Sequence, residues 1–170
     1  MAEIGVLKPD AQVELLDGQV FDCFRISPLH AAVTCQLSQP FFGRPERDCT
    51  VSVRNPVRLD EYSEVQPDVM LVKYRSDYYS ARHPEPQDVY VLMEVADESL
   101  AFDREIKLPA YGRAGICEVW IVDLVDQVVE IYREPNFNGY SSKTIMRAGD
   151  QAKAQAFPEV GIDVAQLLRR

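Results

Sequence analysis

Residues 89–95 read Val-Tyr-Val-Leu-Met-Glu-Val, an apolar run interrupted by a single acid, Glu94. A shorter apolar run, Val-Met-Leu-Val at 69–72, lies upstream and follows directly on Asp68. Continuous apolar runs of this length are typical of interior strands that helices cover on both faces. The two runs therefore predict the central strands of an α/β sheet.

Shorter patterns on either side predict the rest of the sheet and its helices. Asp17-Gly18 is a turn pair within alternating residues at 13–21, which predicts an N-terminal β-hairpin. Ser27 before Pro28 predicts the start of a helix over 28–37. Further strands are expected at 49–53, 119–124, 128–133 and 144–146, and a short helix at 164–168. Strands that precede and follow a helix favour a mixed sheet in one α/β layer structure.

The segment at 97–114 has helical spacing, and Gly115 is a suitable C-terminal stop. Pro109 conflicts with a continuous helix, because proline removes a backbone hydrogen bond and clashes with the preceding turn. Either the helix kinks or it begins nearer to Pro109, and the sequence leaves both arrangements open. Phe102 and Tyr111 are expected to pack this helix on the sheet and are assigned no chemistry.

The composition restricts the class of protein. The chain has 170 residues, 46% of them hydrophobic, and a formal net charge of −9. This suits one globular domain spanning residues 1–170. No apolar run approaches the roughly 18 residues of a membrane helix, and the N-terminus lacks the form of a signal peptide. We therefore expect a cytoplasmic protein with no membrane partner.

The four cysteines and two histidines have no zinc-binding spacing, and disulfides are not expected in a reducing compartment. The acidity argues against a protein that coats nucleic acid through net positive charge. It does not exclude an enzyme that meets phosphates through a bound cation.

Two acids and a lysine form the candidate site. Glu94 ends an apolar strand, where a buried charge needs a cation or a shifted pKa. Asp68 opens the other strand, so antiparallel pairing would bring both carboxylates to one edge of the sheet. Two hard oxygen ligands with room for water suit Mg²⁺ or Mn²⁺. Lys107 lies 13 residues beyond Glu94, where a returning helix can bring it to the same place, and Asp103 would share its helix face.

This set of residues suits hydrolysis of a phosphodiester bond. A cation would neutralise the phosphate and activate water, and the lysine would hold that water or stabilise the developing charge. Each residue alone has an ordinary structural explanation, as a turn residue, a strand end or a solvated helix pair. Their joint pattern favours a site.

The same segments resemble one bacterial family of restriction endonuclease-like proteins within the PD-(D/E)XK nuclease superfamily. The resemblance covers about residues 13–168, with its specific block at 67–123. It implies a restriction endonuclease-like fold, with a mixed central β-sheet flanked by helices. The stretches that carry it lie at 66–69, 91–96, 103–107, 111–116 and 118–123, with Glu-Leu-Leu-Asp-Gly at 14–18 as a weaker match.

The resemblance also implies roles for individual residues. Asp68 and Glu94 would bind the metal. The third position of the E-x-K tripeptide is Ala96, so the usual strand lysine is missing, and Lys107 on the following helix matches its replacement in this family. The supporting positions are Asp103, which matches the acid beside that lysine, Glu14, which would correspond to an N-terminal glutamate of many superfamily members, and His30, which matches a histidine of the first helix.

The implied function is that of an endonuclease that hydrolyses DNA with Mg²⁺ or Mn²⁺, as a homodimer, as is common in the superfamily. An alternative is a non-catalytic nuclease fold kept for binding or assembly. The net negative charge supports this alternative, and the intact Asp68, Glu94 and Lys107 oppose it. A nuclease acting on RNA or on structured DNA would look the same at this level.

The connection at 73–88 is the best candidate for nucleic-acid contact, because it interleaves cations with aromatic rings. The candidates are Lys73, Arg75, Tyr78, Tyr79 and Arg82. The two tyrosines would equally well anchor a long loop onto the sheet.

Overall fold

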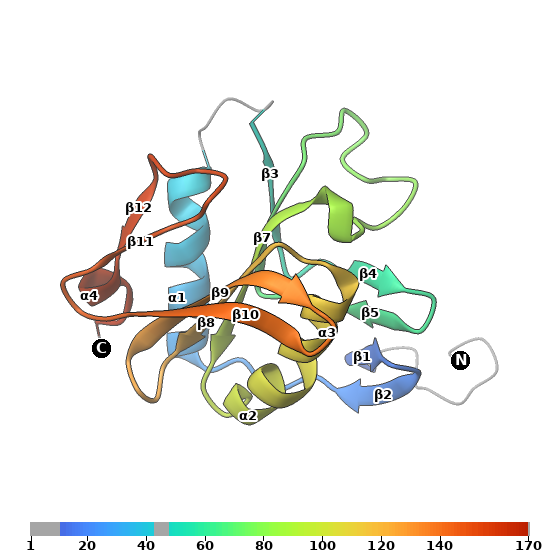
Figure 1. Ribbon diagram of the computed structural model, residues 1–170, viewed down its shortest axis with the longest axis horizontal. Helices are drawn as coiled ribbons and strands as arrows, with labels where there is room; N and C mark the ends of the chain where they lie inside the picture. Colours follow the sequence, from blue (N-terminus) through green and yellow to red (C-terminus); the bar gives the residue numbers. More distant parts are fainter. Residues whose placement is uncertain (1–10, 43–47, 170) are drawn as a thin grey trace.

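The computed structural model describes residues 11–42 and 48–169, and its centre is a mixed six-stranded sheet (Figure 1). The strand order is β10-β9-β8-β7-β6-β3, with β7 and β8 parallel and every other neighbouring pair antiparallel. This confirms the predicted mixed sheet. The strands are β3 (Thr50–Val53), β6 (Val69–Val72), β7 (Val89–Ala96), β8 (Glu118–Asp123), β9 (Val128–Asn136) and β10 (Gly139–Met146).

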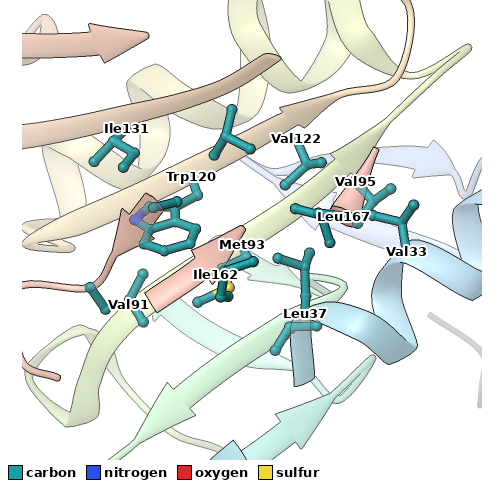
Figure 2. Packing of buried hydrophobic residues seen from close by; sticks show 14 of the residues in the cluster. Val33, Leu37, Val91, Met93, Val95, Trp120, Val122, Ile131, Ile162 and Leu167 are labelled. Carbon is teal, nitrogen blue, oxygen red and sulfur yellow. The ribbon is translucent and has the colours of Figure 1, made fainter. Parts of the chain in front are cut away.

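Helix α1 (Pro28–Ser38) covers one face of this sheet, and its start at the Ser27 cap confirms the prediction. Because side chains alternate along a strand, Val91, Met93 and Val95 of β7 point to this face. They pack there with Leu37 of α1 and with Trp120 of β8 (Figure 2). The same face receives a short 3₁₀ turn and the C-terminal elements, which are η1 (Gln39–Phe41), β11 (Gln151–Lys153), β12 (Gly161–Asp163) and α4 (Val164–Leu167).

The opposite face is covered by the helical segment after β7. This segment consists of α2 (Leu100–Phe102), a π-helical turn η3 (Asp103–Lys107) and α3 (Leu108–Ala114). The N–H of Leu108 donates to the carbonyl of Asp103, five residues back, which widens the turn ahead of Pro109. Pro109 then lies in the first turn of α3, directly after this widened turn. The predicted helical segment is present, and α3 begins next to the proline.

A smaller antiparallel sheet, in the order β2-β1-β5-β4, lies beside the helical segment. Its hairpin of β1 and β2 around Asp17-Gly18 confirms the prediction. The other two strands were not expected from the sequence, because they are short and carry charges among their apolar residues. The strands are β1 (Val13–Leu16), β2 (Gln19–Asp22), β4 (Val57–Asp60) and β5 (Ser63–Val65).

The connection between β6 and β7 is a long loop that ends in a 3₁₀ turn, η2 (Pro86–Asp88). Within the described part of the chain, no helix is both long enough and apolar enough to cross a membrane.

Candidate active site

The pairing of β6 with β7 places the two predicted acids side by side. The strands are antiparallel, with Val69 opposite Met93, so Asp68 stands next to Glu94. The N–H of Asp68 donates to Oε2 of Glu94 at 3.3 Å, and Oδ2 of Asp68 accepts from the N–H of Val95 at 2.9 Å. Both acids are buried, with 5% and 3% of their surface exposed. Two carboxylates are therefore fixed together inside the protein.

Lys107 joins these acids from the π-helical turn η3. Its Nζ lies 2.9 Å from Oε1 of Glu94 and 3.1 Å from Oε1 of Glu14, and it is buried. Asp103, one turn earlier, lies 4.0 Å from the same Nζ. The helical segment thus brings Lys107 to Glu94 on the face of the sheet opposite to α1, as the sequence spacing predicted.

The three supporting residues also lie at this site. Glu14 of β1 accepts a second hydrogen bond from the N–H of Gln66 at 2.8 Å, which fixes its carboxylate. Asp103 accepts from the hydroxyl of Ser99 at 2.6 Å. Nε2 of His30 lies 2.8 Å from Oδ1 of Asp68, so α1 contacts the site from the other side. All three side chains therefore hold the orientation of the acids or of the lysine.

Two further residues contact the acids and were missed in the sequence. The Tyr111 hydroxyl donates to Oε1 of Glu94 at 2.5 Å, whereas we expected this ring only to pack. Its position four residues after Lys107, on the same helix face, was a usable signal. Arg54 places NH1 3.2 Å from Oδ1 of Asp68. Nothing local in the sequence marks Arg54, because its position depends on how β3 and β6 pair.

All of these groups except Tyr111 line a narrow cavity of about 40 Å³. Among the Asp, Glu, Lys and Arg side chains that line it, four are acids and two are cations, so these six carry two more negative than positive charges when all are ionised. These side chains are Glu14, Asp68, Glu94, Asp103, Arg54 and Lys107. An excess of buried negative charge is costly unless a proton or a cation neutralises it.

Burial and this excess of negative charge raise the pKa values of two acids of the site, Glu94 and Asp103. Burial raises the pKa of Glu94 to about 8, although the Lys107 ammonium lowers it, and the neighbouring carboxylates raise it further. Burial also raises the pKa of Asp103 to about 6, against the effects of Lys107 and of the Ser99 hydroxyl. Burial lowers the pKa of Lys107, but Glu94 and the other acids outweigh it and the net shift is upward. Lys107 is therefore a cation at neutral pH, while Glu94 tends to hold a proton.

The donor set can be tested against a divalent metal. Among residues 11–42 and 48–169, no three His, Cys, Asp or Glu side chains are grouped as a ready metal-ligand set. Mg²⁺ needs fewer protein ligands, because it commonly binds through one or two carboxylates and keeps several waters. The paired carboxylates of Asp68 and Glu94, together with the excess negative charge around them, fit such an ion.

The structure does not bring the loop at 73–88 to this site. Lys73 follows Val72, which pairs with Val89, at the end of the strands opposite to Asp68 and Glu94. Within the loop, Arg75 pairs with Asp77 and Arg82 with Asp88, both at 2.7 Å. Both guanidinium groups also lie over the ring of Tyr79, whose hydroxyl donates to the carbonyl of Lys73. Tyr78 is exposed. Nucleic-acid contact by this loop stays a prediction.

The mixed sheet and its flanking helices have the restriction endonuclease-like fold. A solved structure, described as a putative nuclease belonging to DUF820 from Anabaena variabilis, is similar to this chain with a TM-score of 0.73. The similarity covers 98% of this chain and 94% of that one at 11% sequence identity, which confirms the predicted fold class.

Residues 2–165 match the Uma2 family, which is described as "Putative restriction endonuclease". The chain belongs to this family, and the resemblance found in its sequence is confirmed. The family supports a nuclease-like function. No curated protein gives a significant match.

Proposed function

We propose that the chain is a metal-dependent endonuclease that hydrolyses phosphodiester bonds of DNA. The observation that carries this proposal is the convergence of two buried acids, Asp68 and Glu94, with the buried cation of Lys107. Burying three ionisable groups together is unfavourable for a fold that needs only stability. Their position in a cavity of a restriction endonuclease-like fold favours catalysis as the reason for the arrangement.

Asp68 and Glu94 would hold Mg²⁺ or Mn²⁺, which when bound neutralises the phosphate and lowers the pKa of a coordinated water. Lys107 remains a cation between Glu94 and Glu14. It therefore stabilises the negative charge that develops on the phosphate, or orients the attacking water. His30 holds the carboxylate of Asp68 in place from α1.

The decisive experiment is cleavage of supercoiled plasmid DNA with Mg²⁺ or Mn²⁺. We expect the wild-type protein to nick or linearise the plasmid. Asp68→Asn and Lys107→Met keep the side-chain size, and each is expected to reduce the rate by about 10²–10³-fold. Asp68→Asn removes a charged ligand of the metal ion, and Lys107→Met removes the positive charge beside the reacting phosphate. Lys153→Met, an exposed lysine of β11, is the matched control and should cleave normally.

Cleavage by Asp68→Asn at the wild-type rate would refute the assigned site. A wild-type protein that neither cleaves DNA nor binds Mn²⁺ would support the non-catalytic binding module instead, which the net charge of −9 favours. Thermal unfolding of each variant establishes that it is folded.

We also propose that the active form is a homodimer, since two sites are needed to cut both strands in one encounter. Light scattering coupled to size-exclusion chromatography measures this directly. A monomer that linearises plasmid would contradict it.

A further inference from the structure

Arg54 has an unusual backbone conformation at the entrance to the candidate active site. It follows β3 with φ of +52°, in the left-handed region that a residue with a side chain rarely adopts. Its N–H donates to the carbonyl of Asp68 at 3.1 Å. Such conformations persist only where surrounding contacts hold them, and they are concentrated at functional sites. The backbone of Arg54 is therefore fixed directly beside Asp68.

The side chain of Arg54 is held much less firmly than its backbone. NH1 lies 3.2 Å from Oδ1 of Asp68, an oxygen that also contacts His30 at 2.8 Å. The guanidinium has no second hydrogen-bond or ion-pair partner among the described residues. Its side chain is 29% exposed, whereas that of Asp68 is 7% exposed. A single contact at the edge of a cavity can exchange more readily than a two-pronged one.

The other cation of the cavity, Lys107, cannot move in this way. It is buried and lies within 3.1 Å of two carboxylates, those of Glu94 and Glu14. Arg54 is thus the one cation among the described lining residues that can reach a ligand outside the cavity. In a chain with net charge −9, a DNA phosphate needs such a group at the entrance.

We propose that Arg54 is an exchangeable cation that neutralises Asp68 until a divalent ion binds there, and then contacts a phosphate of the DNA backbone. This inference rests on the proposed nuclease function and adds a residue that binds substrate. A guanidinium with several unused N–H donors suits the planar, two-pronged recognition of a phosphate. Its fixed backbone would keep that contact next to the reacting group.

The first test measures Mn²⁺ binding by calorimetry in wild type, Arg54→Gln and Arg54→Lys. If Arg54 competes with the ion, Arg54→Gln is expected to bind Mn²⁺ about tenfold more tightly, because a positive charge next to the ligand is removed. Arg54→Lys should lie between Arg54→Gln and wild type. Arg58→Gln, an exposed arginine of β4, controls for the change in total charge and should leave Mn²⁺ affinity unchanged. Equal or weaker Mn²⁺ binding by Arg54→Gln would overturn the proposal.

The second test measures DNA affinity by fluorescence anisotropy with Mn²⁺, in a Lys107→Met background that slows cleavage. Adding Arg54→Gln is expected to weaken binding of a DNA duplex about tenfold and to reduce the salt dependence of log K by about one. Unchanged affinity with an unchanged salt slope would overturn the phosphate contact.

The inference and the proposed function fail in different ways. If wild type cleaves plasmid and Arg54→Gln matches it in every assay, only the inference is wrong. If Arg54→Gln behaves as expected in both binding tests but wild type never cleaves, only the nuclease function is wrong. Absence of Mn²⁺ binding in all variants would overturn both.

Discussion

The π-helical turn η3 contributes one cation to each of two ionic clusters on the same face of the sheet. The acids of both clusters are buried, and the clusters differ in their balance of charge. Lys107 enters the candidate active site, where four acids face two cations. Arg104 enters a second cluster, with NH2 2.6 Å from Asp123 and 3.0 Å from Glu130. Lys143 of β10 lies 2.7 Å from the same Glu130. This second cluster therefore contains two acids and two cations.

The pKa shifts of the acids follow that difference. Burial acts to raise the pKa of Glu130, but hydrogen bonds from Arg104, Lys143 and Tyr132 outweigh it and lower the pKa. At Glu94 burial and neighbouring acids prevail, and the pKa rises to about 8. A buried cluster whose charges cancel is explained by the fold alone. The acids around Glu94 keep an excess of negative charge, and this excess is the difference on which the proposed metal binding rests.

The cluster of Asp123, Glu130, Arg104 and Lys143 is called the balanced cluster below, and the candidate active site the unbalanced cluster. The largest expected effect on stability comes from removing a cation of the balanced cluster. Arg104→Met leaves the fully buried Asp123 without its cation, while Glu130 keeps only Lys143. Losing one partner of a buried pair costs about 3–4 kcal/mol of the free energy of unfolding, because the remaining charge stays desolvated. Urea unfolding at pH 7 measures this loss. A loss below about 1 kcal/mol, which is typical of exposed ion pairs, would show that the cluster is not structural.

The excess of acids in the unbalanced cluster should make the free energy of unfolding decrease as the pH rises. The pKa of Glu94 rises from 4.5 to about 8 on folding, so the folded protein binds this proton more tightly than the unfolded chain. Its contribution is complete below pH 4.5 and is lost as pH rises through 8. One proton changes stability by at most about 1.4 kcal/mol per pH unit, and we expect a loss of about 3–4 kcal/mol between pH 5 and 8.

Urea unfolding with EDTA at several pH values tests this, with Glu94→Gln as the matched variant. The amide cannot titrate, so the difference between wild type and Glu94→Gln isolates this group. The difference should favour wild type at pH 5 and disappear or reverse at pH 8. A wild-type advantage that grows with pH would mean that Glu94 is ionised throughout and that its charge is already balanced.

The sequence was sufficient to predict the main residues of the candidate active site, but not those of the balanced cluster. Asp68 and Glu94 stood out because acids at the ends of apolar strands are rare, and antiparallel pairing of the two strands was the condition under which they would meet. Lys107 was located by its helical spacing. Arg104 and Asp123 lie in the stretches 103–107 and 118–123 but were indistinguishable from ordinary surface charges, because their ion pair joins the helical segment to strand β8. Charge balance is a property of the folded neighbourhood and has no local signal.

The fold shows the same limit. Strands with long apolar runs, the Ser27 cap and the Asp17-Gly18 turn were all predicted, since each depends on adjacent residues. Strands β4 and β5 were not, because they are short and carry charges among their apolar residues. The conflict at Pro109 was recognised, but the sequence left open how the helical segment resolves it. Arg54 was missed because it reaches Asp68 only through the pairing of β3 with β6.

A divalent cation should stabilise the unbalanced cluster alone. Mg²⁺ at ten times its dissociation constant is expected to add about 1.4 kcal/mol to the free energy of unfolding of wild type at pH 8. Arg104→Met should show the same gain from its lower baseline, whereas Asp68→Asn should show none. Thermal unfolding with and without Mg²⁺ measures these gains. An equal gain in Asp68→Asn would place the ion elsewhere.

The smallest expected effect comes from removing Lys143, the most exposed residue of the balanced cluster. The Lys143 side chain is 42% exposed, so water replaces much of its contact with Glu130 when it is removed. Lys143→Met should therefore cost only about 0.5–1 kcal/mol. The double variant with Arg104→Met should lose more than the sum of the single losses, because Glu130 then keeps no cation. Strict additivity, measured by urea unfolding, would mean that the two cations do not share Glu130, and the cluster would then not be balanced as a unit.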